Sequence, residues 1–236
     1  MKKCKFMPYW LAGYPNFEKS LENTRVLMEY CDIIEVGIPH SDPIADGSVI
    51  QNAHRVAIEN GFQTGDIFTF LEQLNAQKPV VLLTYLNTIL QFGVENFANS
   101  AKKNGVNAIL VPDLPPEHCE LIRPIFAEKN IKIIFIISTN TPLERVKYID
   151  EISDYFIYFV CKPSITGVQN DIEAETLEFL KNIKTFVKNP IFAGFGISNK
   201  AQVEKLSLSG ADGFIIGSKF VNMNSEEIRG VCVGFV

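Results

Sequence analysis

Three acidic side chains lie close together in the sequence at Glu35, Asp42 and Asp46. Glu35 interrupts the apolar run 32–38, which has the composition of a buried strand, and the two aspartates follow in a loop rich in proline and glycine. A carboxylate on a buried strand loses its hydration, which raises its pKa and suits it to proton transfer near neutral pH. The alternative that these residues leave open is a structural glutamate paired with a lysine or with backbone amides.

Further polar and aromatic side chains follow the ends of other apolar runs. Tyr85 and Asn87 come at the end of one run, Asp113 follows the next, and Tyr158 precedes a loop that contains Thr166. Each has a structural explanation when taken alone, because tyrosines fill barrel interiors and Asp-Leu-Pro is common in turns. Their shared position at the carboxyl ends of strands predicts that they face one site together with the acidic loop.

Glycine-rich turns follow the last two apolar runs. Gly194-Phe195-Gly196-Ile197-Ser198 follows one run and Gly217-Ser218 the other, and Gly167 lies in an earlier loop. Glycine lets backbone amides approach an anion closely, and a helix that begins there adds partial positive charge. The pair of turns therefore predicts a phosphate site. It is not a dinucleotide fingerprint, because the third glycine is missing and the motif lies near the end of the chain.

Other kinds of reactive centre find little support in the sequence. The histidines His40, His54 and His118 are widely separated and form no metal-binding motif, so no metal site is predicted. No lysine lies inside an apolar run as a candidate for a Schiff base. Lys162 and Lys219 lie just beyond strand ends, where contact with phosphate or with solvent is expected.

The elements that must position these residues form a regular alternation. Strands are predicted at about 5–12, 32–38, 80–85, 108–112, 132–137, 154–160, 190–195 and 213–217, and helices at about 17–30, 49–76, 91–104, 117–128, 142–151, 172–188, 199–209 and 219–230. Several strands are apolar throughout, which is typical of a parallel sheet covered on both faces. The pattern favours an α/β protein with a closed (β/α)8 TIM barrel over an open doubly wound sheet. We expect one domain, 1–236, with minimal extensions at both ends.

Composition narrows the classes of function. The chain has 236 residues with a formal net charge of −5, and its basic residues are scattered. Binding of nucleic acid or of an anionic membrane surface is therefore not expected. The five cysteines form no CxxC pair, which indicates reduced thiols. There is no apolar run long enough for a signal peptide or a transmembrane helix, so a cytoplasmic protein is expected.

The pattern Glu-x-Gly-x-Pro-x-Ser-Asp-Pro-x-Ala-Asp-Gly that begins at Glu35, together with the Gly-Phe-Gly-Ile-Ser turn, resembles the tryptophan synthase α subunit family. The similarity extends from about Met7 to Ser218. It implies a phosphate-binding barrel that cleaves indole-3-glycerol phosphate to indole and glyceraldehyde 3-phosphate. It also implies a β subunit as partner in an α2β2 heterotetramer, to which indole is passed. Pyridoxal phosphate is expected in that partner, and no cofactor in this chain.

The resemblance also implies roles for individual residues. The family's acid/base glutamate corresponds to Glu35, its indole-ring aspartate to Asp46 and its active-site tyrosine to Tyr158. Thr166 corresponds to a loop threonine that contacts the aspartate on closure. The indole pocket corresponds to Tyr9, Leu83, Tyr85 and Phe195, and the phosphate site to Gly167, Gly196, Gly217 and Ser218.

The sequence also departs from the family pattern. His40 stands where the family often has phenylalanine, Ser48 where it has proline, and the loop 161–167 gains Pro163 and loses a glycine. A shorter N-terminus and C-terminal helix add to these differences, so changes in loop closure and in coupling to the partner are expected. Two other functions stay open. One is a barrel kept mainly to activate the β subunit, and the other is an enzyme acting on a ribulose phosphate, which the acidic loop and the absence of a strand lysine disfavour.

Overall fold

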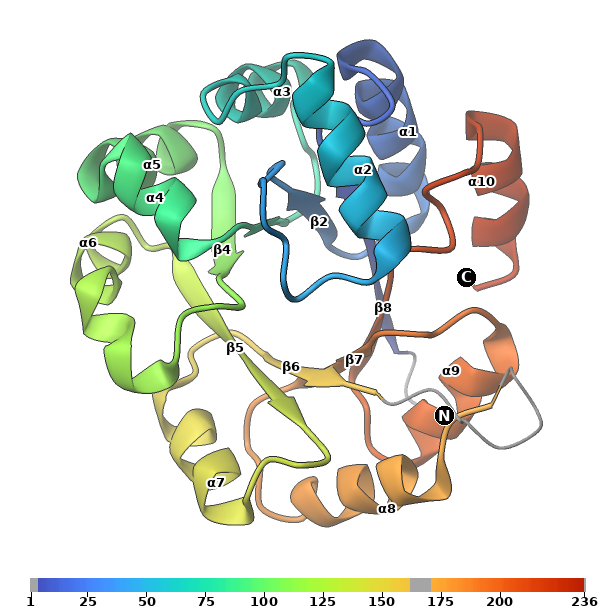
Figure 1. The fold of residues 1–236 in the computed structure, drawn as a ribbon. Coiled ribbons are helices and arrows are strands. Elements are labelled where there is room, and N and C mark those ends of the chain that lie inside the picture. The colour runs from blue at the N-terminus through green and yellow to red at the C-terminus, as the bar shows by residue number, and fades with distance from the viewer. Residues whose placement is uncertain (1–3, 162–170, 236) are drawn as a thin grey trace.

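The computed structural model describes residues 4–161 and 171–235, and its centre is a barrel of eight parallel strands. Each strand pairs with the strands before and after it in the sequence, and β8 closes the barrel on β1 (Figure 1). The strands are β1 (Lys5–Leu11), β2 (Ile34–Gly37), β3 (Val80–Leu83), β4 (Val106–Leu110), β5 (Lys132–Ser138), β6 (Ile157–Val160), β7 (Ile191–Gly194) and β8 (Gly213–Ile216). The predicted closed (β/α)8 barrel is confirmed, and an open sheet is excluded.

Helices surround the barrel and cover the outer face of its strands (Figure 1). They are α1 (Phe17–Tyr30), α2 (Ser48–Glu59), α3 (Asp66–Leu74), α4 (Leu86–Phe92), α5 (Val94–Lys103), the 3₁₀ helix η1 (Pro116–Leu121), α6 (Arg123–Glu128), α7 (Leu143–Ile152), α8 (Ala174–Ile183), α9 (Lys200–Leu208) and α10 (Ser225–Val233). In the described part of the chain, no helix is long and apolar enough to cross a membrane.

The strands bury side chains on both faces because successive residues of a strand point in opposite directions. In β1, Met7 and Tyr9 belong to a cluster that fills the barrel, whereas Phe6 and Trp10 belong to a larger cluster between strands and helices. Glu35 is the neighbour of Tyr9 in the register between β1 and β2, so it also faces the interior. The runs in the sequence are apolar at every position because both faces of these strands are buried.

Several predicted helices have different bounds in the structure. The stretch 49–76 is divided into α2 and α3, and 91–104 is replaced by α4 and α5. Gly61 and Gly93 have φ values of 88° and 87°, a conformation that glycine adopts readily and that ends a helix. The prediction of a helix at 219–230 is wrong by several residues, because 218–222 forms turns and α10 begins at Ser225.

Candidate active site

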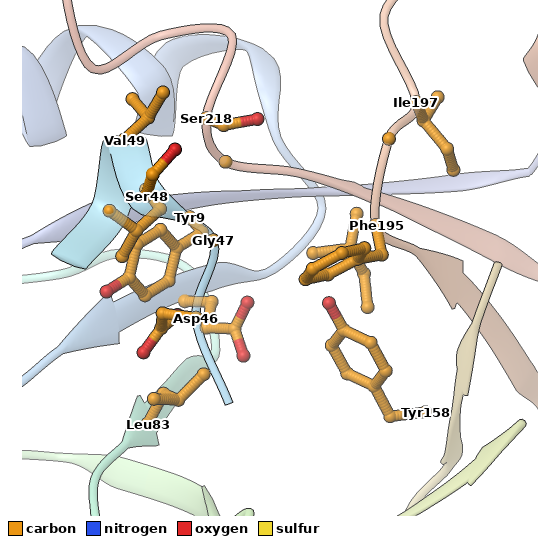
Figure 2. Close-up of a pocket in the computed structure, with 15 residues that line it drawn as sticks. Tyr9, Asp46, Gly47, Ser48, Val49, Leu83, Tyr158, Phe195, Ile197 and Ser218 are labelled. Carbon is orange, nitrogen blue, oxygen red and sulfur yellow. The ribbon is translucent and has the colours of Figure 1, made fainter. Parts of the chain in front are cut away.

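A cavity of about 260 Å³ opens at the carboxyl ends of the strands. Figure 2 shows Asp46 and Tyr9 on one side of it and Tyr158 and Phe195 on the other. The cavity is lined by Tyr9, Glu35, Asp46, Gly47, Ser48, Val49, Ile50, Leu83, Tyr158, Phe195, Gly196, Ile197, Ile215, Gly217 and Ser218. Residues from the first, second, third and sixth to eighth strands and their loops therefore meet at one place.

Glu35 is the buried acid of this cavity. Its side chain is on β2, the residue is 1% exposed, and Oε1 has no hydrogen-bond partner among the residues that the structure describes. Burial raises the pKa of Glu35 to about 8, and the nearby charge of Asp46 adds to the increase. Glu35 is therefore a neutral carboxylic acid near pH 7 and can donate a proton into the cavity.

Asp46 comes from the loop between β2 and α2. Its Oδ2 accepts a hydrogen bond of 2.7 Å from the hydroxyl of Tyr85, which in turn accepts the backbone N–H of Ala45 at 3.2 Å. Tyr85 is buried and does not line the cavity, so it lies behind Asp46. The Tyr85 hydroxyl thus holds the Asp46 carboxylate on the side away from the cavity, and the carboxylate presents a hydrogen-bond acceptor to the cavity.

Two tyrosines bring hydroxyl groups to the cavity. Burial raises the pKa of both Tyr9 and Tyr158 well above the usual value, so both phenols stay protonated and can donate. The close approach of each phenol depends on a glycine. A Cβ on Gly37 would lie 2.2 Å from the Tyr9 hydroxyl, and one on Gly194 would lie 2.4 Å from the Tyr158 hydroxyl.

The side of the cavity formed by β7 and β8 carries the two glycine-rich turns. Phe195 and Gly196 have φ values of 78° and 77°, which form a tight turn directly after β7. Gly217 and Ser218 follow β8, and Nζ of Lys219 donates a hydrogen bond of 2.6 Å to the backbone oxygen of Ser198 in the other turn. The two turns therefore lie together at this side of the cavity, joined by the Lys219 side chain, and glycine turns in this place in a barrel are suited to binding a phosphate group.

A second cavity of about 540 Å³ adjoins the first and shares Asp46, Leu83, Tyr158 and Phe195 with it. It extends along the loop after β4 and along β5 itself, where its lining is mostly apolar and includes several prolines. Asp113 lines it, but its carboxylate accepts the backbone N–H of Leu86 at 2.9 Å, at the start of α4. Asp113 therefore has a structural role at the start of that helix.

The structure brings most of the predicted site residues together. Those that line the first cavity are Tyr9, Glu35, Asp46, Leu83, Tyr158, Phe195, Gly196, Gly217 and Ser218. Asp42 is exposed on the loop and lines neither cavity. Thr166 and Gly167 lie outside the described residues, so their predicted roles stay predictions.

The sequence analysis missed a contact between two histidines. His40 and His54 are far apart along the chain, yet the backbone N–H of His40 donates to Nδ1 of His54 at 2.9 Å. The only sequence signal was a histidine on the apolar face of a predicted helix. No group of three or more His, Cys, Asp or Glu within 4–161 and 171–235 could hold a metal ion.

Comparison with known proteins agrees with this geometry. A sequence model of a family described as tryptophan synthase alpha chain matches residues 1–232. The tryptophan synthase alpha chain of Methanococcus voltae is 41% identical over 228 residues, which cover 95% of this chain and 80% of that relative. The alpha chain of Thermococcus kodakarensis is 37% identical over 236 residues, covering 97% and 94%.

Solved structures give the same result. The tryptophan synthase complex of Pyrococcus furiosus includes a chain with a TM-score of 0.90 and 35% identity, covering 100% of this chain and 99% of that one. A structure of the a2b2 complex from the same organism, described in terms of mutual activation, has a TM-score of 0.93 at 36% identity. Because the family model and the relatives cover nearly the whole chain, it belongs to the tryptophan synthase alpha chain family.

Proposed function

We propose that this chain is a carbon–carbon lyase that cleaves indole-3-glycerol phosphate to indole and glyceraldehyde 3-phosphate. The observation that carries the proposal is the pairing of Glu35, whose pKa is raised to about 8, with Asp46 in one cavity. Two carboxyl groups in different surroundings can take different roles, one as acid and the other as a fixed acceptor. The two glycine turns on the far side of the cavity provide a place for the phosphate.

In the proposed reaction, the neutral Glu35 first gives its proton to C3 of the indole ring. The ring then carries positive charge that is shared with its nitrogen, and Asp46 accepts a hydrogen bond from the ring N–H and stabilises that charge. The Glu35 carboxylate next takes the proton of the glycerol hydroxyl beside the ring. As the carbonyl forms, the bond to C3 breaks and its electron pair returns to the ring, which releases indole and restores the acid.

The phosphate-binding turns hold the substrate so that its ring reaches both carboxyl groups. We propose that the backbone amides around Gly196, Gly217 and Ser218 bind the phosphate oxygens, with the Lys219 ammonium close by. Tyr9, Leu83 and Phe195 contribute apolar surface around the ring. Binding energy gained at the phosphate, remote from the breaking bond, then orients the reacting carbon.

We propose further that the chain assembles with a β subunit into an α2β2 heterotetramer. Its relative from Pyrococcus furiosus forms such a complex. Exposed apolar side chains lie on the segments after β2, β3 and β4, at Ile44, Leu90 and Leu121, and such side chains favour burial by a partner. The adjoining larger cavity offers indole a route away from Glu35. Pyridoxal phosphate belongs to the β subunit in this proposal, and a cytoplasmic location fits cysteines whose spacing forms no CxxC pair.

The proposal is tested by measuring indole release from indole-3-glycerol phosphate by the purified chain, alone and with added β subunit. Glu35→Gln should lose most turnover because it has no proton of suitable pKa to give, yet it should keep its affinity for a non-cleavable indole alkyl phosphate within a few-fold. Glu95→Gln, an exposed change on α5, is the matched control. A chain that activates the β subunit but releases no indole at any ratio would instead be a binding partner without chemistry of its own.

A further inference from the structure

The fully buried imidazole of His54 has no part in the reaction proposed above. His54 is on α2 and is 0% exposed, and it lies beside Asp46, which lines the first cavity. Its Nδ1 accepts the backbone N–H of His40 at 2.9 Å, so this nitrogen has no proton. The neutral ring then carries its proton on Nε2, which fixes the tautomer.

The Nε2 atom of His54 lies beside the Asp46 carboxylate. Nε2 lies 3.4 Å from Oδ2 of Asp46, and no hydrogen bond to Nε2 is formed within the described part of the chain. A buried N–H without a hydrogen bond is unfavourable, so a small movement of the Asp46 carboxylate toward it would be stabilised. Catalytic hydrogen bonds are often long in a free enzyme and shorten when substrate binds.

Oδ2 of Asp46 thus accepts the Tyr85 hydroxyl at 2.7 Å, and Nε2 of His54 lies close to it at 3.4 Å without a hydrogen bond. With Oδ2 turned toward these groups, Oδ1 is the oxygen left to accept the ring N–H of a substrate. A hydrogen bond from Nε2–H that forms as the substrate binds would then hold Oδ1 toward the ring nitrogen before positive charge develops there, which favours electrostatic stabilisation.

The same contacts join the acidic loop to its neighbours. The His40 ring stacks on Tyr85 with ring centroids 4.6 Å apart, and Nδ1 of His40 lies 3.1 Å from the hydroxyl of Thr88. The backbone N–H of His40 donates its hydrogen bond to Nδ1 of His54. A loop, two helices and a strand end are thus linked around one aspartate, which limits how far it can rotate.

From this geometry we propose that His54 is a positioning residue that orients Asp46 through its Nε2–H, together with Tyr85. The inference rests on the proposed role of Asp46 as acceptor for the substrate's ring N–H. It assigns His54 no contact with the substrate, and its effect should be confined to steps that depend on the ring nitrogen.

Two substitutions separate the observed hydrogen bond at Nδ1 of His54 from the proposed one at Nε2. The amide N–H of His54→Gln reaches about as far as Nε2, so this variant keeps a donor for Asp46. The amide oxygen of His54→Asn reaches about as far as Nδ1, so this variant keeps the acceptor for His40 and loses the donor. Both variants are neutral and polar, and they therefore serve as controls for each other. Thermal unfolding of each variant shows whether the fold is retained.

The readout is the preference for indole-3-glycerol phosphate over its benzofuran counterpart, which has no ring N–H. We expect His54→Asn to lower kcat/KM for the indole substrate about tenfold, the effect of one lost hydrogen bond to a charged group, and to leave the benzofuran substrate unchanged. His54→Gln should retain most of the preference. Equal losses in both variants, or an unchanged preference in His54→Asn, would overturn the proposal.

The proposed tautomer of His54 can also be tested on the unmodified protein, so that this test does not depend on whether a His54 variant folds. Proton–nitrogen spectra of the chain with ¹⁵N-labelled histidine should show His54 protonated on Nε2, with that proton shifted downfield when a non-cleavable indole alkyl phosphate binds. Protonation on Nδ1, or no shift on binding, would contradict the inference. Asp46→Asn is assayed in parallel: normal turnover there would overturn the proposed function as well, whereas impaired turnover with no effect in His54→Asn would overturn the inference alone.

Discussion

Replacing Glu35 by glutamine should change the stability of the fold in a way that depends on pH. Burial raises the pKa of Glu35 from its usual 4.5 to about 8 in the folded chain. Below pH 4.5 the carboxyl group is protonated in both the folded and the unfolded chain. Between pH 4.5 and 8 only the unfolded chain releases this proton, so ionisation stabilises the unfolded state and the free energy of unfolding falls as pH rises.

The magnitude follows from the same shift. Each pH unit in this interval lowers the free energy of unfolding by about 1.4 kcal/mol, because one proton is bound in the folded state and none in the unfolded state. From pH 5 to pH 8 the loss amounts to roughly 4 kcal/mol, a large part of the stability of a typical domain. Glutamine has no proton to release at this position. Glu35→Gln should therefore gain stability relative to the parent chain by that amount over the interval.

Urea unfolding of both proteins at pH 5, 6, 7 and 8 measures this difference. At pH 5 the two proteins also differ in the free energy of unfolding because one buries an amide and the other a carboxylic acid. Only the change of that difference with pH measures the effect of ionising Glu35. Glu95→Gln, on the exposed side of α5, should give a curve parallel to that of the parent chain. A difference in the free energy of unfolding between Glu35→Gln and the parent chain that stays constant from pH 5 to pH 8 would refute the reasoning.

The same raised pKa of Glu35 predicts that kcat/KM of the parent chain falls above about pH 8, as Glu35 loses the proton it must donate.

Three other changes have definite expected outcomes. Asp46→Asn should move the alkaline fall of residual kcat/KM to lower pH, because the charge of Asp46 helps to raise the pKa of Glu35, and a pH–rate profile of the variant checks this. Lys219→Met should raise KM about tenfold with little change in kcat, through the loss of one charge-assisted contact beside the phosphate turns, and an initial-rate assay in low salt measures it. Gly194→Ala should displace the Tyr158 hydroxyl, which its Cβ would meet at 2.4 Å, and should lower kcat and weaken binding of a non-cleavable analogue; unchanged kinetics would contradict that.

The local sequence determined the strands and the acid that one of them carries. The runs at 80–83 and 133–137 are apolar at every position, and this pattern alone indicated strands buried on both faces. Glu35 within such a run indicated a carboxyl group of raised pKa, and in the folded chain burial raises that pKa to about 8. These features were predictable because burial and periodicity act on residues that are neighbours in the chain.

The sequence could not determine where one helix ended and the next began. Gly61 and Gly93 were visible in the sequence, but glycine is tolerated inside helices, so its presence alone does not mark an end. The positive φ values that divide these segments belong to the folded backbone and are not specified by the residue type alone. The same applies to the turns at 218–222, which replace the first part of a predicted helix.

Only the tertiary structure decided which side chains hold the site together. Tyr85 lies 39 residues from Asp46, and the backbone N–H of His40 reaches the ring of His54 across 14 residues. No periodicity relates such pairs, because their contact depends on the strand register and on the closure of the barrel, which bring β3 and α2 to either side of one loop. The sequence therefore specified the reactive groups, whereas the fold specified their hydrogen-bond partners and so the orientation in which they can react.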